Sequence, residues 1–193
     1  LAPVPNSDPV QSDWSMSTVG LSVGGDSSCA LFDARTLPNG NILYCCGRDT
    51  TANSETTGVA EINPITREIV WQWRDPAWVA DNGPEAAYKL TNGNYLICDV
   101  DGTAGANLAT TDIIYELTPA KTKVWGYKDG ARPNRIKPCY INGKFCIAIF
   151  GSAFGGADDR VQILDYDTRT IVWSMTNIGT LVTHAENAIN GGD

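Results

Sequence analysis

The chain has 193 residues, of which 42% are hydrophobic and 19% are charged. This composition excludes a disordered chain and is sufficient for a substantial buried core. The net charge of −8 argues against a basic surface that would bind nucleic acid or anionic lipid. No apolar run approaches the roughly 18 residues of a membrane-spanning helix, so no insertion into a membrane is expected.

Residues 1–24 are predicted to form an N-terminal segment that carries one isolated strand. The segment begins with Leu-Ala-Pro-Val-Pro, which is compatible with removal of a signal peptide, although a chain trimmed in another way would begin in the same manner. Six cysteines in an acidic chain indicate an oxidising compartment, so we expect a secreted, extracellular protein. Residues 14–20 (WSMSTVG) resemble residues 173–179 (WSMTNIG), and the isolated strand therefore matches a strand found later in the chain.

An internal repeat of about 50 residues organises the rest of the chain. One landmark is an Asn-Gly hairpin, found at 37–43 (LPNGNIL), 90–96 (LTNGNYL) and 141–145 (INGKF). The other is a strand ending in Val-Trp, found at 66–71 (TREIVW), 121–125 (KTKVW) and 168–173 (TRTIVW). These landmarks divide the chain into repeats at 25–80, 81–130 and 131–180, followed by the first strand of a further repeat at 181–193.

Each repeat is predicted to contain four strands. The first strand enters the Asn-Gly turn and the second leaves it, at 41–46, 94–99 and 144–150. A third strand, such as 113–117, precedes a polar turn and the fourth strand, in which apolar residues alternate with polar ones. We therefore expect an all-β fold: a β-propeller-like array of four-stranded blades, with three complete repeats and one strand at each end.

The tryptophans divide into two groups. Trp71, Trp125 and Trp173 occupy equivalent positions, which predicts equivalent, mostly buried core sites. Trp78 lies outside the strand pattern, beside Asp75-Pro76, and is the better candidate for an exposed ring that binds a sugar. Loss of binding without loss of stability in a Trp71, Trp125 or Trp173 variant would instead indicate sugar stacking.

Cys139 and Cys146 flank the third hairpin. A two-residue Asn142-Gly143 turn places these two cysteines directly opposite each other on adjacent strands. This placement predicts a Cys139–Cys146 disulfide. The pairing of Cys29, Cys45, Cys46 and Cys98 stays open, because the sequence does not choose among three connectivities.

The hairpin and Val-Trp motifs resemble the repeats of the pyrroloquinoline-quinone-enzyme and arylsulfotransferase β-propeller families, over about residues 25–193. The resemblance implies a scaffold and leaves the function open. Arylsulfotransferases place a nucleophilic histidine near the position of His184, which makes His184 a weak catalytic candidate without nearby Arg or Lys. Asp99 and Asp101 are a weak candidate for a calcium site, and no residue cluster predicts a cofactor.

These features favour a non-catalytic extracellular structural or assembly protein. The strands expected at 10–21 and 182–193 would each leave an edge that can pair with another copy of the chain, and such pairing produces either a closed ring or a filament. The alternatives are a carbohydrate-binding propeller module, with glycans as partners, and a remnant of an arylsulfotransferase-like enzyme.

Overall fold

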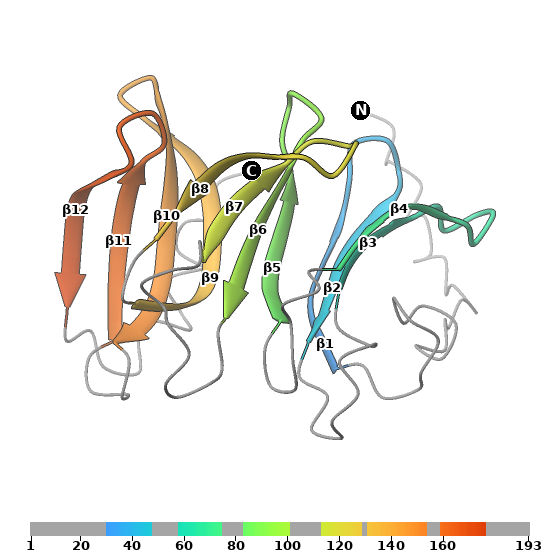
Figure 1. The fold of residues 1–193 in the computed structure, drawn as a ribbon, viewed down its shortest axis with the longest axis horizontal. Helices are drawn as coiled ribbons and strands as arrows, with labels where there is room; N and C mark the ends of the chain where they lie inside the picture. Colours follow the sequence, from blue (N-terminus) through green and yellow to red (C-terminus); the bar gives the residue numbers. More distant parts are fainter. Residues whose placement is uncertain are drawn as a thin grey trace, which may run out of the picture.

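The computed structural model describes residues 30–47, 58–74, 83–100, 113–128, 131–153 and 159–176. In these ranges the chain is all-β, as predicted, and forms three four-stranded antiparallel sheets. Each sheet follows the order of the sequence, so every strand pairs with the strand that precedes or follows it (Figure 1). Among the described residues, no helix has the length and apolar character needed to cross a membrane.

The strand bounds agree with the expected four strands in each repeat. The first sheet contains β1 (Ala30–Thr36), β2 (Ile42–Gly47), β3 (Gly58–Ile62) and β4 (Ile69–Trp73). The second contains β5 (Gly83–Lys89), β6 (Tyr95–Val100), β7 (Ile114–Leu117) and β8 (Lys123–Tyr127). The third contains β9 (Ala131–Ile141), β10 (Lys144–Ala153), β11 (Asp159–Asp165) and β12 (Thr170–Thr176).

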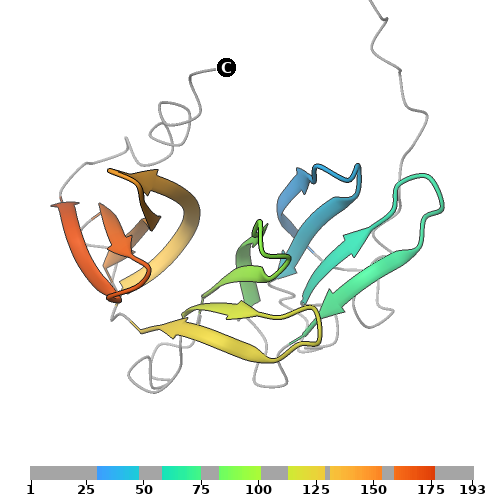
Figure 2. The ribbon, with the colours of Figure 1, turned by 90° about the horizontal axis from the view of Figure 1, so that it is seen from above.

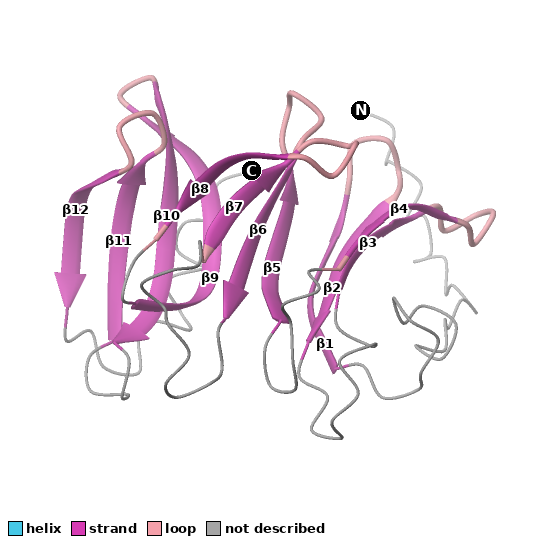
Figure 3. Cartoon of the chain, viewed as in Figure 1, coloured by secondary structure: helices cyan, strands magenta, loops and turns pink. Residues whose placement is uncertain are grey.

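The Asn-Gly turns hold the first two strands of every sheet together, and they lie at the same end of the three sheets (Figure 3). Gly40, Gly93 and Gly143 all have φ between 78° and 86°, a region in which a side chain is strained. In the first turn the Leu37 amide donates a hydrogen bond to the Asn41 carbonyl, which closes a three-residue loop, and the Gly40 amide donates to the Leu37 carbonyl within it. The third turn is shorter, because Asn142 and Gly143 both have positive φ and form the expected two-residue loop.

The sheets stand side by side along an open arc (Figure 2), and β5 contacts both β1 and β9. The second sheet is covered on both faces, so alternate residues of β6 belong to different cores. Tyr95 and Ile97 pack against the first sheet, whereas Leu96 and Cys98 pack toward the third. Because successive side chains of a strand point to opposite faces, the second sheet can pack on the first sheet with one face and on the third sheet with the other.

The predicted Cys139–Cys146 disulfide is wrong, although the predicted register is confirmed. The two cysteines are direct partners across β9 and β10, yet both thiols are free. Counting from the two-residue turn, Ile141 and Lys144 form a hydrogen-bonded pair, so Cys139 and Cys146 occupy the next pair of that kind. Side chains are farther apart at hydrogen-bonded pairs, beyond the separation that a disulfide requires.

We expect both thiols of this pair to react with an alkylating reagent once the chain is unfolded without a reductant. In the folded protein Cys139 should react slowly, because burial and the neighbouring Cys146 raise the pKa of its thiol. Peptide mapping by mass spectrometry checks both statements. A Cys139–Cys146 cross-linked peptide in the unreduced sample would contradict them.

The described cysteines do not pair with one another. Cys45, Cys98, Cys139 and Cys146 are free. Burial raises the pKa of the Cys45 and Cys98 thiols, which lie in the two cores. These two thiols therefore act as small apolar side chains.

Candidate functional site

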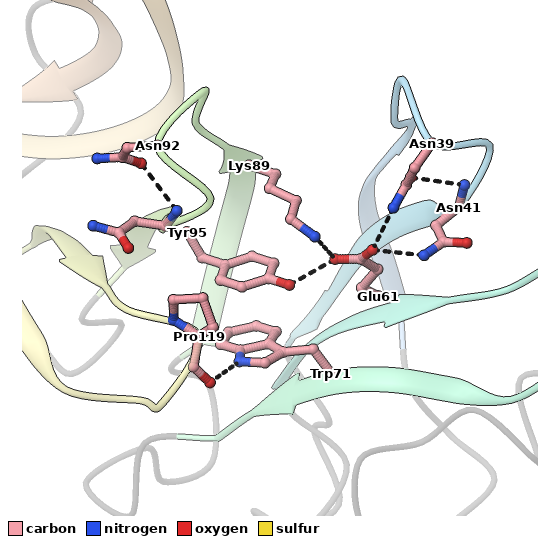
Figure 4. Close-up of polar contacts among 9 residues, drawn as sticks. Asn39, Asn41, Glu61, Trp71, Lys89, Asn92, Tyr95 and Pro119 are labelled. Atoms are coloured by element: carbon pink, nitrogen blue, oxygen red, sulfur yellow. Dashed lines mark hydrogen bonds and ion pairs between the residues drawn. The ribbon is translucent and has the colours of Figure 1, made fainter.

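A buried carboxylate joins the first sheet to the second (Figure 4). Glu61, on β3, has a fully buried side chain that accepts four hydrogen bonds. Two donors come from the Asn-Gly turn of its own sheet and two from the second sheet. They are Asn39 Nδ2 at 3.1 Å, Asn41 Nδ2 at 2.6 Å, Lys89 Nζ at 2.6 Å and Tyr95 Oη at 2.6 Å.

These donors determine the charge state of Glu61. Burial by itself would raise the pKa of the carboxyl, but the hydrogen bonds from Lys89, Tyr95 and the two asparagines lower it to about 2. Burial and the Glu61 carboxylate in turn raise the pKa of the Tyr95 hydroxyl. Glu61 is therefore ionised at neutral pH and serves as an acceptor that fixes the second sheet against the first.

A tryptophan completes this junction. The Trp71 ring, on β4, stacks on the Tyr95 ring with centroids 3.7 Å apart and planes inclined by 7°. Its Nε1 donates a hydrogen bond of 3.0 Å to the Pro119 carbonyl, in the turn after β7. One indole thus contacts both a strand and a turn of the neighbouring sheet (Figure 4).

The second and third sheets are joined by the same chemistry. Glu116 accepts hydrogen bonds from Asn92, Asn94 and the Tyr166 hydroxyl. Trp125 stacks on Tyr166 at a centroid distance of 4.6 Å, and its Nε1 donates to the Tyr166 carbonyl at 2.9 Å. In both junctions, an acid of one sheet therefore accepts a hydrogen bond from a tyrosine hydroxyl of the next sheet. A tryptophan of the first sheet stacks on the same tyrosine and donates a hydrogen bond to a turn carbonyl of the next sheet.

The third sheet carries a tryptophan without this junction. Trp173 pairs with Ile163 across β11 and β12, at the position where Trp71 pairs with Glu61. The prediction that all three tryptophans are mostly buried is confirmed for Trp71 and Trp125, at 8% and 7% exposure, and wrong for Trp173, at 46%. The reason is that no further sheet covers Trp173 in the described part of the chain.

We use the name open face for the part of the third sheet around Trp173. Met175, two residues along β12, is 48% exposed on the same side of the strand. Cys139 and Ile163 on this side are partly buried against a small apolar cluster. In the two other sheets, the corresponding face is covered by the next sheet.

Arg135, on β9, ties the three sheets together and was missed by the sequence analysis. Its Nη1 lies 3.3 Å from Glu85 Oε2 on β5, and its Nη2 donates to the Phe32 carbonyl on β1 at 3.2 Å. A single guanidinium therefore links the first strands of all three sheets. The residues around Arg135 in the sequence do not predict these contacts, because its partners belong to two other repeats and approach it only when the sheets stack.

Of the residues proposed from the sequence for metal binding, sugar binding or catalysis, only Asp99 lies in the described part of the chain. Asp99 lies in β6 and is partly buried, and Asp101 is outside the described residues, so the calcium hypothesis stays a prediction. Trp78, His184 and the strands expected at 10–21 and 182–193 also lie outside them. Within the described ranges, no group of three or more His, Cys, Asp or Glu side chains could hold a metal ion.

Comparison with known proteins gives a likeness of fold alone. No family model and no curated protein matches the chain. A solved structure, hydrazine synthase of Kuenenia stuttgartiensis, is similar over 74% of this chain with a TM-score of 0.50 and 14% sequence identity. The match spans 36% of that protein's chain. Hydrazine synthase has β-propeller subunits, and the three sheets described here form an open arc.

Proposed function

We propose that this chain is a non-catalytic assembly module, a section of a β-propeller-like array that binds further copies of itself. The observation that carries the proposal is the contrast among three equivalent tryptophans, of which Trp71 and Trp125 are covered by the next sheet and Trp173 is 46% exposed. The three-sheet arc and its likeness to a protein with β-propeller subunits support the type of array.

A second copy fits the open face because the chain already builds such contacts internally. In both junctions, the tryptophan-bearing face of one sheet packs on a sheet of the same repeat type. A contact between two different faces is heterologous, and it produces either a closed ring or an extended filament. The terminal strands expected at 10–21 and 182–193 would add edge pairing to this contact.

The extracellular location belongs to the same proposal. It rests on the six cysteines of the chain. The arylsulfotransferase-like activity expected of a catalytic His184 stays a prediction. A sulfate-transfer assay of the parent and of His184→Ala tests it directly.

Substitution at the open face tests self-association. We expect the parent chain to form larger species as its concentration rises and the Trp173→Arg variant to stay smaller, because a charge at this position opposes burial of the face. Val172→Arg is the matched control, since Val172 is 56% exposed on the same strand β12 and lies on the side opposite Trp173, outside the open face. Sedimentation velocity over a range of concentrations measures the difference.

Two results would contradict the proposal. One is a parent chain that is monomeric at every concentration, and the other is an equal effect of Trp173→Arg and Val172→Arg. A chain shortened to residue 181 separates the contribution of the expected terminal strand from that of the open face. Association that survives Trp173→Arg and is lost on this truncation would assign the contact to the terminal strand instead.

A further inference from the structure

A hollow lies between the second and third sheets, at the end that carries the Asn-Gly turns. Its volume is about 390 Å³, within the range of small-molecule sites. Residues 88–92, which lead from β5 into the second Asn-Gly turn, form one side. Side chains of β9, β10 and the turn after β11 form the other side, and they include Tyr140, Phe145 and Tyr166.

Aromatic rings dominate the wall on the side of the third sheet. Tyr140 and Phe145 have ring centroids 5.4 Å apart, and Phe145 and Tyr166 have centroids 5.1 Å apart. Tyr140 is the outermost of these three aromatic residues and is 71% exposed. The exposed Tyr140 ring is therefore held by Phe145, which in turn contacts Tyr166, and such a ring can stack on the face of a ligand.

The polar groups of the hollow are of two kinds. The Lys89 ammonium, at 2.6 Å from Glu61, and the Asn92 amide, at 3.1 Å from Glu116, are bound to buried carboxylates. Thr91 and Asp167 line the hollow from exposed turns and supply a hydroxyl and a carboxylate. The cation of the hollow is therefore already neutralised, and the available groups suit a ligand that offers hydroxyls.

We propose that this hollow binds a neutral sugar ring, which stacks on Tyr140 and exchanges hydrogen bonds with Asp167 and Thr91. A pyranose has an apolar face of C–H groups and a rim of hydroxyls, and it matches an aromatic wall bordered by oxygen atoms. The acidic net charge of the chain and the pairing of Lys89 with Glu61 disfavour an anionic ligand.

This inference is independent of the proposed assembly function. Tyr140 and Phe145 are direct partners on the side of the third sheet that faces the second sheet. Cys139, the preceding residue of β9, belongs to the opposite side, which carries the open face. Failure of sugar binding would therefore leave self-association untouched, and the reverse also holds.

Calorimetric titration of the full chain tests the proposal with tetrasaccharides of β-linked glucose, N-acetylglucosamine and mannose. We expect at least one to bind in the micromolar to millimolar range. Tyr140→Ala should weaken binding about tenfold or more, and Tyr140→Phe should retain most of it. Ile141→Ala, at the next residue of β9 and on the other side of the strand, is the matched control and should bind as the parent does.

Choline chloride serves as a cationic probe, because aromatic walls also bind quaternary ammonium groups. Choline binding that depends on Tyr140, without saccharide binding, would overturn the sugar assignment. The proposal also fails if no saccharide binds at millimolar concentration, or if Tyr140→Ala and Ile141→Ala bind the saccharide equally well. Unfolding curves of both variants confirm that each one is folded, as expected for two exposed residues.

Discussion

Replacing Trp125 with alanine is expected to lower the free energy of unfolding by about 3–5 kcal/mol, the range for a large aromatic deletion from a core. The indole is 7% exposed, stacks on Tyr166 and donates a hydrogen bond of 2.9 Å to its carbonyl. The substitution removes the stacked ring, leaves a cavity between two sheets and takes the indole donor away from the partly buried Tyr166 carbonyl. Chemical denaturation followed by circular dichroism measures the loss.

The other two tryptophans provide matched comparisons. Trp71→Ala should cost a similar amount, because its stacking on Tyr95 and its bond to Pro119 reproduce the Trp125 contacts. Trp173→Ala should cost less than about 1 kcal/mol in dilute solution, because nearly half of this side chain is already exposed. Equal losses at all three positions would show that Trp173 is covered in solution, contrary to the structure.

The repeat pattern was sufficient to predict the sheets. The Asn-Gly turns and the Val-Trp strands are local signals, since a left-handed glycine and an alternating strand depend on neighbouring residues. For this reason the strand positions and the register of the third hairpin are confirmed. The predicted Cys139–Cys146 disulfide was wrong for a finer reason, namely that wide and narrow pairs alternate along two antiparallel strands.

The contacts between sheets could not be predicted in the same way. Tyr95 comes from strand β6, whereas Tyr166 comes from the turn between β11 and β12, so the two junction tyrosines are not equivalent in the repeats. Both still reach an acid and a tryptophan of the preceding sheet. Glu61 and Glu116 stand in equivalent Glu-Ile-Asn-Pro and Glu-Leu-Thr-Pro motifs, which was a usable signal for a shared role.

The same argument explains the open face. The third sheet has Ile163 where the first has Glu61, as the pairing of Trp173 and Trp71 shows. A buried acid requires donors from the next sheet, whereas an isoleucine requires only apolar cover. A partner at this face is therefore expected to contribute apolar side chains rather than a lysine and a tyrosine hydroxyl.

Replacing Glu61 with alanine is expected to lower the free energy of unfolding by about 3–5 kcal/mol, the cost of breaking a buried ion pair from one side. The Lys89 ammonium and the Tyr95 hydroxyl, each 2.6 Å from the carboxylate, would lose their acceptor inside the first junction. Glu61→Gln should cost less, because the amide oxygen still accepts hydrogen bonds. Glu68→Gln, on the exposed turn before β4, is the matched control and should be close to neutral.

The dependence of stability on pH tests whether the negative charge of Glu61 causes the stabilisation. Its pKa is about 2 in the folded chain and near 4.5 when unfolded, so the unfolded state binds more protons between these values. The contribution of the charge is therefore complete above about pH 5 and is lost as the pH falls toward 2. The difference in stability between the parent and Glu61→Gln should shrink over that interval, by at most about 1.4 kcal/mol per pH unit. A difference that stays constant from pH 6 to about pH 3 would assign the loss to packing rather than to the ionised carboxylate.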